Sequence, residues 1–273
     1  MKKIIKKVIS EIAKPILDKT LLFKGQHSGG SCYIFGDGVS IKWFDLDAFT
    51  TKPVFSLSCI PFHKNAKMLD VKYALLTQPY FFYPFVKTAP DLGKKWYRNK
   101  IKDKFIELFK TNKELNCFVS LSNYPVLRAQ NIFHLFGTIN DPECDYLKDC
   151  NKNGIGIYEG SLHASISLAI YMGFEEIILV GCDYTHKNSR IGHWYEKGKG
   201  SLSKHLNYEQ KFLKIACKYA KIITITKDDS GDILPGISYN EYTGRLLNYR
   251  ENDKIMDIET LKLLDAYPDY NIF

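Results

Sequence analysis

Short apolar runs alternate with longer amphipathic stretches along most of this chain. The runs have the length and composition of buried strands, and the stretches between them place apolar residues at helical spacing. The predicted strands are Cys32–Phe35, Val54–Leu57, Tyr73–Leu76, Cys117–Leu121, Ile177–Val180 and Ile222–Thr226. Helices are predicted over 94–115, 161–172, 206–219 and a shorter stretch near 257–265. This alternation predicts an α/β fold, with a Rossmann-like, mostly parallel sheet and flanking helices.

The same pattern divides the 273 residues into two parts. Residues 1–30 form a basic amphipathic helix and a linker, and residues 31–273 form a single nucleotide-binding α/β domain. Within that domain, the segment 183–205 is rich in Gly, Lys, Ser and His and is long for a connection, so we expect a mobile lid there.

Positive charge is concentrated in two predicted helices. The net charge is +8, but residues 1–24 alone carry seven lysines against Glu11 and Asp18, and residues 94–113 carry eight basic residues against Asp103 and Glu107. The rest of the chain is therefore slightly acidic. A local anionic surface is the expected partner, and no nucleic-acid-binding signature accompanies the charge.

The first helix is the stronger membrane candidate. Its isoleucines recur at helical spacing with lysines largely opposite, and no apolar run exceeds two residues, which excludes a signal peptide or a membrane span here. Such a helix lies on an anionic bilayer or packs against protein, and we favour the bilayer. Pro15 should kink or end it. In the second helix the stripe Ile101, Phe105, Leu108 and Phe109 favours packing.

The seven cysteines are odd in number and several fall within predicted strands or helices. They are typical of free thiols in a reducing cytosol. The chain has no CxxC pair and no HExxH sequence, so no metal site is expected.

Two predicted strands end in turns suited to a ligand. The turn Gly36-Asp37-Gly38-Val39-Ser40 follows the first strand, and Gly181-Cys182-Asp183-Tyr184 follows Ile177–Val180. Parallel strands bring such ends to one edge of the sheet, where α/β folds form ligand crevices, and glycines allow backbone N–H groups to approach a phosphate. The first turn is equally compatible with a purely structural tight turn.

Further polar groups end the other strands or open the helix before Ile177. They are Ser58, Gln78, Asn123 and the small-residue turn Gly160-Ser161. Amides and hydroxyls in these places can hydrogen-bond a base and a ribose, although ordinary turns use the same residues.

Two histidines are candidates for a general base. His193 lies in the segment Ile191-Gly192-His193-Trp194-Tyr195, and His205 lies just before the helix near Leu206. His134 and His163 fall on apolar elements and are expected in the core.

Several of these motifs, in this order, resemble the bacterial sialyltransferases of glycosyltransferase family forty-two, and more loosely the related lipopolysaccharide- and flagellin-modifying transferases. The family sequences G-N-G-P-S-L, Asn-Pro with aromatics, and C-S-N-Y resemble Gly36–Ile41, Gln78–Phe82 and Leu121–Tyr124. The most specific match is the helix and strand of Gly160–Tyr184. The resemblance covers about residues 31–230. The chain departs from it at Asp37, Ser58 and Gln78, where the family has asparagine, and at Thr185, where it has tyrosine.

The resemblance implies roles for these residues. Asp37, Ser58, Gln78, Ser161, Gly181 and Asp183 would line a CMP pocket, Tyr184 would lie near the phosphate, and Tyr195 would offer a second hydroxyl. The family's catalytic histidine stands within I-G-H, which Ile191-Gly192-His193 matches, whereas His205 better matches its distance to the following helix. We rank His193 first.

The function expected from the resemblance is inverting, metal-independent transfer of sialic acid or a related nonulosonic acid. A CMP-activated sugar would be the donor, a lipooligosaccharide or capsule glycan the acceptor, and no cofactor would be needed. The enzyme would be cytoplasmic, at the inner face of the bacterial inner membrane. Because related enzymes often form tetramers, a homo-oligomer is also an option. The alternatives are a Mg²⁺-dependent diphosphokinase-like enzyme and a non-catalytic membrane-associated adaptor.

Overall fold

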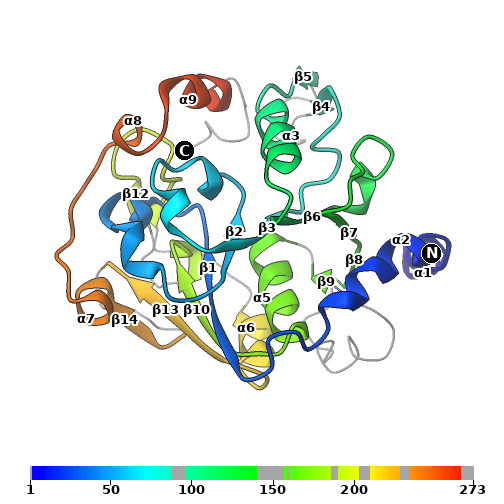
Figure 1. The fold of residues 1–273 in the computed structure, drawn as a ribbon, viewed down its shortest axis with the longest axis horizontal. Coiled ribbons are helices and arrows are strands. Elements are labelled where there is room, and N and C mark those ends of the chain that lie inside the picture. Colours follow the sequence, from blue (N-terminus) through cyan, green and yellow to red (C-terminus); the bar gives the residue numbers. More distant parts are fainter. Residues whose placement is uncertain are drawn as a thin grey trace.

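An eight-stranded, entirely parallel sheet forms the centre of the molecule, in the order β14-β13-β10-β1-β2-β3-β6-β7 (Figure 1). The computed structural model describes residues 2–87, 96–139, 157–158, 160–185, 190–202, 210–227 and 234–265. The strands are β1 (Gly30–Phe35), β2 (Val54–Leu57), β3 (Val71–Leu76), β6 (Asn116–Ser120), β7 (Ile132–Leu135), β10 (Phe174–Val180), β13 (Lys221–Thr226) and β14 (Gly236–Ser238). The predicted α/β class and parallel sheet are confirmed.

Alternate residues of each strand supply two separate hydrophobic cores, one on each face of the sheet. One face packs against α5 (Ser161–Tyr171) and α6 (Gln210–Ala216). The other packs against α3 (Lys102–Thr111), α7 (Tyr239–Thr243), α8 (Asn252–Ile255), α9 (Ile258–Asp265) and several 3₁₀ segments. Those segments include η2 (Val39–Trp43), η3 (Leu46–Phe49), η4 (Ile60–Phe62) and η5 (Ala66–Met68). The sheet is therefore the middle of three layers.

Short strand pairs complete the described structure. Strands β4 (Phe85–Lys87) and β5 (Trp96–Arg98) are antiparallel, as are β11 (Arg190–Ile191) and β12 (Ser201–Leu202), while β8 (Gly137–Ile139) and β9 (Ile157–Tyr158) are parallel. The 3₁₀ segments η7 (Leu121–Asn123) and η8 (Asp183–Thr185) follow β6 and β10.

The helix expected over 94–115 is wrong at both ends. Residues 96–98 form β5 instead, because Trp96 pairs with Lys87 and Arg98 with Phe85, and aromatic residues favour such pairing. The helix itself ends at Thr111, and Asn112 then uses its side-chain oxygen to accept a hydrogen bond from Leu115 N at 3.2 Å. The apolar stripe is buried against the domain as expected.

The N-terminal segment breaks near Pro15, as predicted. Helix α1 (Lys2–Ile12) ends before Ala13, and α2 (Lys14–Leu17) and η1 (Asp18–Phe23) follow it. Phe23 anchors this segment, with its ring 4.7 Å from that of Phe133 and 5.0 Å from that of Phe118. Helix α1 itself lies at the edge of the molecule (Figure 1).

The expected linker is bound to the domain. Backbone N–H groups of Gly25, His27 and Gly29 donate to carbonyls in the last turn of α5 and just after it. The His27 ring stacks on Phe174 with centroids 4.3 Å apart. This segment therefore fixes the end of α5 relative to β1.

Candidate active site at the carboxyl edge of the sheet

The strand order reverses between β1 and β10, because later strands add on one side of β1 and then on the other. The two glycine-containing turns singled out in the sequence follow these two neighbouring strands. In open α/β sheets this reversal point is where ligands bind. The candidate residues on these turns are therefore brought to the expected edge.

The two turns pack against each other. Gly36 N donates to Val180 O at 2.8 Å, and Gly38 N donates to Gly181 O at 2.7 Å. A Cβ atom at Gly38 would lie only 2.5 Å from Gly181 O and 2.6 Å from the Asp183 carboxyl group. Close backbone packing thus accounts for the glycines, as in the structural alternative of the sequence analysis.

Asp183 and Ser40 connect the turns further. Asp183 is 3% exposed, and its Oδ2 accepts from Ser40 N at 2.8 Å while its Oδ1 accepts from the Ser40 hydroxyl. The carboxylate thus satisfies donors at the start of η2. In this structure both side chains stabilise the two turns at the carboxyl edge of the sheet.

Asp37 lies between the ends of β1 and β2. Its Oδ1 accepts from Trp194 Nε1 at 3.0 Å, its Oδ2 accepts from Cys59 N at 3.3 Å, and the Ser58 side chain also bonds to it. Ser58 has a φ of 45°, a strained conformation for a residue other than glycine. Burial raises the pKa of Asp37, and the nearby His193 opposes that shift.

His193 faces this carboxylate and is paired with a second one. Its Nδ1 lies 2.8 Å from Glu196 Oε1, and its backbone N–H donates to Glu196 Oε2 at 3.1 Å. A carboxylate can only accept here, so Nδ1 carries the proton and the ring exchanges protons through Nε2. The side chains of His193 and Glu196 are 20% and 15% exposed, so the pair is partly shielded but reachable.

The residues after His193 fix its ring. Trp194 is fully buried, and its backbone N–H donates to Asp37 O at 3.1 Å. Tyr195 is 3% exposed and stacks on the imidazole, with centroids 5.0 Å apart and planes 9° apart. Tyr195 is thus placed as a support for His193, within the core cluster.

Lys42 binds the backbone of the loop that carries His193. Its fully buried Nζ donates to Glu196 O and Gly198 O, both at 2.5 Å, and to Glu251 Oε1 at 2.6 Å. Burial lowers the pKa of Lys42, and Glu251 opposes this most strongly. Glu251 in turn accepts from Gly198 N and the Tyr249 hydroxyl. Lysine and glutamate together tie the loop 190–202 to η2 and to the C-terminal segment.

Tyr184 lies beside the pair. Burial raises its pKa, a hydrogen bond with the Gly192 backbone opposes the shift, and the charges of Asp183, Glu196 and Asp37 raise it further. The side chain of Tyr184 is half-buried, so a hydroxyl group remains at the edge of the sheet.

The start of α5 lies at the same edge. Ser161 Oγ is 2.9 Å from Thr77 Oγ1, at the end of β3. Gly160 precedes the helix with a φ of 108°, a conformation that favours glycine. The first N–H groups of an 11-residue helix and the Ser161 hydroxyl provide the donors that a phosphate group prefers.

Asn123 is placed differently from Ser161. It is fully buried: its Oδ1 accepts from Phe82 N at 3.0 Å, and its Nδ2 donates to Gln78 O at 3.2 Å. Its amide group is thus used to hold the turn after β3. Gln78 lies on this turn through its backbone, and its side chain is half-exposed.

Among the other histidines, His134 and His163 are buried as expected. His205, the second candidate base, lies outside the described residues, as do 186–189 and 203–205 of the predicted lid. The part of the lid segment that the structure describes at 190–202 is held by Trp194 and Lys42.

Four residues that position the site were not among the candidates from the sequence: Lys42, Trp194, Glu196 and Glu251. Glu196 carried a usable signal, because a glutamate three residues after a histidine can return to its imidazole within one turn. Lys42 and Glu251 carried none, since they are separated by 209 positions.

Asp37 and Asp183 are the two aspartates at this edge that could ligate a metal ion. Within the described ranges, no group of three or more His, Cys, Asp or Glu side chains is arranged to hold a metal ion. Both oxygens of Asp37 and of Asp183 accept hydrogen bonds from protein donors. In this structure the carboxyl groups of both residues are thus engaged by protein donors.

Comparison with known proteins gives a distant structural likeness. No family model and no curated protein matches the sequence. The sialyltransferase CstII from Campylobacter jejuni, in complex with the substrate analogue cytidine-5'-monophosphate, is 16% identical, with a TM-score of 0.45 over 88% of this chain and 98% of that one. A complex of CST-II with trisaccharide acceptor and CMP is also 16% identical, with a TM-score of 0.43 over 86% of this chain and 99% of that one. At these values of sequence identity and TM-score, the likeness does not assign the activity of those enzymes to this chain.

None of the described helices combines the length and the apolar composition needed to cross a bilayer.

Proposed function

We propose that this protein is an inverting glycosyltransferase that uses a CMP-activated nonulosonic acid, with His193 as the general base. The single observation that carries the proposal is the His193–Glu196 pair beside Asp37 at the reversal point of the sheet. A carboxylate-oriented imidazole at a ligand-binding edge is the arrangement that proton abstraction from a hydroxyl requires. The ordered sequence motifs supply the donor class.

The chemistry follows from the positions of these groups. His193 Nε2 would take the proton from an acceptor hydroxyl, whose oxygen attacks the anomeric carbon. The bond from that carbon to the phosphate oxygen breaks, and CMP departs with the electron pair. Glu196 would stabilise the charge that the imidazole acquires, as a carboxylate does in other base–carboxylate pairs.

The departing phosphate needs donors on the opposite side. The N-terminal N–H groups of α5 and the Ser161 hydroxyl are suited to its charge, and Tyr184 can supply a further hydroxyl. None of these steps needs a metal ion or another cofactor. Asp37, Ser58 and Gln78, at three successive strand ends, would then contact the nucleotide.

We also place the enzyme at the inner, anionic surface of the bacterial membrane, where lipid-linked acceptors of surface glycans are found. The apolar residues Ile5, Val8, Ile9 and Ile12 of α1 are 52%, 51%, 38% and 76% exposed. An exposed apolar stripe on a lysine-rich helix is the pattern of an interfacial membrane helix.

Two variants test the assignment of the base. We expect His193→Ala to abolish sugar transfer from CMP-sialic acid and to leave CMP binding unchanged, whereas His205→Ala retains activity. Loss of activity in His205→Ala alone would move the role to that residue. If both variants stay fully active, the proposed mechanism is wrong.

Nucleotide choice tests the reaction class. A ligand that binds only the native state raises the melting temperature. We expect CMP to stabilise the protein without added metal, and ATP not to do so with Mg²⁺. Stabilisation by ATP only with Mg²⁺ would favour a diphosphokinase-like enzyme, and binding of no nucleotide would favour an adaptor.

A further inference from the structure

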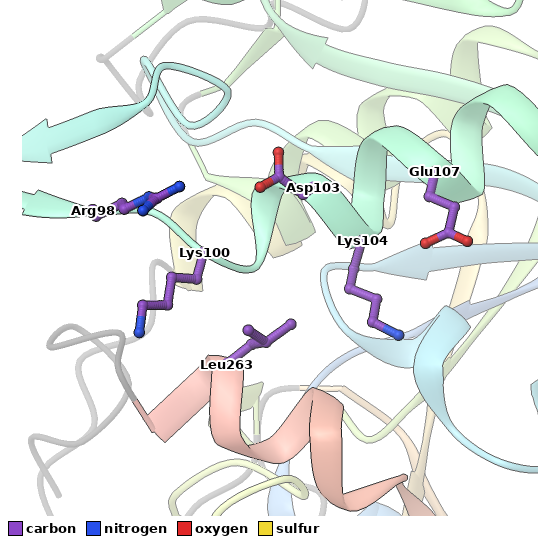
Figure 2. A pocket seen from close by; sticks show the side chains of 6 residues that line it. All are labelled: Arg98, Lys100, Asp103, Lys104, Glu107 and Leu263. Carbon is purple, nitrogen blue, oxygen red and sulfur yellow. The ribbon is translucent and has the colours of Figure 1, made fainter.

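A basic groove lies between α3 and α9, formed by residues that have no role in the site above. It has a volume of about 380 Å³ and is lined by Arg98, Lys100, Asp103, Lys104, Glu107 and Leu263. Figure 2 shows Lys100 and Lys104 extending toward α9, with Leu263 of α9 lying between them. An apolar side chain is thus bordered by two ammonium groups.

The cations of this groove are available for a ligand. Among the residues that the structure describes, no carboxylate lies within ion-pair distance of Arg98, Lys100 or Lys104. Asp103 instead pairs with Lys102, and Figure 2 shows its carboxyl group directed away from α9. The lining thus carries three cations and two carboxylates, of which Asp103 is already paired with Lys102.

The charge of Lys104 acts on a group on the opposite wall. Asp257 precedes α9 and accepts hydrogen bonds from the backbone and side chain of Thr260. Partial burial would raise its pKa, but these bonds, together with the charge of Lys104, hold the pKa below its usual range. Asp257 is therefore a carboxylate on the opposite wall that is influenced by the charge of Lys104.

The groove also lies on the same side of the sheet as part of the candidate active site. Helices α3 and α9 lie on one side of the sheet together with the 3₁₀ segments that follow the ends of β1 and β2 (Figure 1). Phe62 of η4, which begins two residues after Ser58, touches Phe105 of α3 with ring centroids 4.8 Å apart. The groove is thus joined to the candidate active site through one packed layer.

We propose that this groove binds a phosphate group carried by the sugar acceptor, with Arg98, Lys100 and Lys104 as its ligands and Leu263 against the carbon skeleton. Guanidinium and ammonium groups that lack carboxylate partners suit a phosphate, the former in a bidentate manner. The volume admits a phosphorylated monosaccharide unit. The acceptor role rests on the proposed function, whereas phosphate binding itself does not.

The phosphate could belong to a sugar or to a lipid headgroup, and two probes separate these sources. The first is glucose 6-phosphate, with glucose as the neutral control. The second is a vesicle of phosphatidylglycerol and phosphatidylcholine in equal parts, compared with pure phosphatidylcholine. The full-length protein is used throughout, and Kd is measured by titration at low ionic strength.

The decisive comparison uses two variants of equal charge. Lys100→Gln/Lys104→Gln removes two lysines from the groove, and Lys110→Gln/Lys113→Gln removes two exposed lysines at the other end of the same helical segment. We expect the first variant to weaken glucose 6-phosphate binding about tenfold or more and the second to leave it unchanged. CMP binding should be the same in all three proteins.

The outcomes separate the two proposals. Equal loss in both variants, or no binding of either probe by the native protein, overturns the groove. Weakened vesicle binding only in the groove variant, without glucose 6-phosphate binding, assigns the phosphate to a lipid and overturns the sugar acceptor. Failure of CMP to bind, with phosphate binding intact, overturns the proposed function and leaves the groove in place.

Discussion

Glu196 and Tyr195 together orient the imidazole of His193. The bond from its Nδ1 to Glu196 at 2.8 Å fixes the tautomer, and the parallel ring of Tyr195 fixes the plane. The imidazole therefore has one defined orientation before a ligand arrives. Such preorganisation lowers the cost of positioning a base in the transition state.

The Glu196→Gln variant tests the role of the negative charge of Glu196, because it removes that charge and keeps the shape of the side chain. The amide can still accept a bond from Nδ1 but cannot neutralise the imidazolium that forms during proton transfer. We expect kcat to fall about 10- to 100-fold, which is less than the roughly 10²- to 10⁴-fold that the general base itself contributes. The KM for the donor should not change.

Glu241→Gln is the matched control, because Glu241 is an exposed carboxylate on α7. Steady-state kinetics with CMP-sialic acid provide the readout for both variants. An unchanged kcat in Glu196→Gln, in an enzyme that His193→Ala inactivates, would show that Glu196 has no part in the reaction.

At the scale of turns, Gly38 allows the ends of β1 and β10 to meet. A methyl group there would come within 2.6 Å of the Asp183 carboxyl group and closer still to a backbone oxygen. We expect Gly38→Ala to lower the free energy of unfolding by about 1–3 kcal/mol, as overpacking usually does, and to weaken CMP binding.

Gly29→Ala controls for the substitution itself. Gly29 has a φ of 78° but no atom within 4 Å of a new Cβ, so only the backbone strain of about 1 kcal/mol applies. Urea denaturation measures both variants. If Gly38→Ala is no less stable than Gly29→Ala, the two turns are not as tightly packed as the structure indicates.

At the scale of elements, α1 is the helix for which we propose a partner outside the domain. Its apolar residues Ile9 and Ile12 are exposed, while Phe23 already anchors the following segment to the core. The domain therefore does not need the apolar stripe of α1 for its own packing.

Ile9→Glu/Ile12→Glu should abolish most binding to anionic vesicles and leave the melting temperature nearly unchanged, because both side chains are exposed, Ile9 to 38% and Ile12 to 76%. Cosedimentation with phosphatidylglycerol-containing vesicles measures the loss. Leu246→Glu, at a residue 81% exposed elsewhere, is the control for an apolar-to-acidic change. Equal binding by all proteins would contradict the membrane role of α1.

At the scale of the whole molecule, the sequence predicted the buried part of the sheet well. Val54–Leu57 was predicted with its observed bounds, because an apolar run buried on both faces gives a strong local signal. The strand Ile132–Leu135 was missed, since His134 interrupts a short run near the edge of the sheet. Gly236–Ser238 is shorter still and owes its position to β13.

The site was predictable only where local sequence determines it. The turns at Gly36–Gly38 and Gly181–Asp183 follow recognisable strands, so their proximity could be expected. The functions of their side chains could not, because Ser40 and Asp183 satisfy each other across 143 positions. Asn123 likewise resembles a ligand residue in the sequence, yet its amide group bonds to backbone atoms.

The Lys42–Glu251 pair connects three distant segments, and its strength should depend on pH. Partial burial would raise the pKa of Glu251, but hydrogen bonds from Lys42, Asn252 N and Tyr249 hold it at about 2. The folded pKa thus lies below the unfolded value of about 4.3. Stability from this group is present above the unfolded pKa and is lost as pH falls toward about 2.

Glu251→Gln should therefore cost about 1–2 kcal/mol at pH 7, after allowance for the solvent at a carboxylate 38% exposed, and the difference should shrink as the pH approaches 2. Lys42→Met should cost about 3 kcal/mol and lower kcat as well, because the His193 loop loses its buried anchor. Urea denaturation across this pH range is the measurement, with Glu259→Gln, an exposed carboxylate, as control. A difference between Glu251→Gln and the native protein that does not vary with pH would mean that the ion pair does not hold the three segments together.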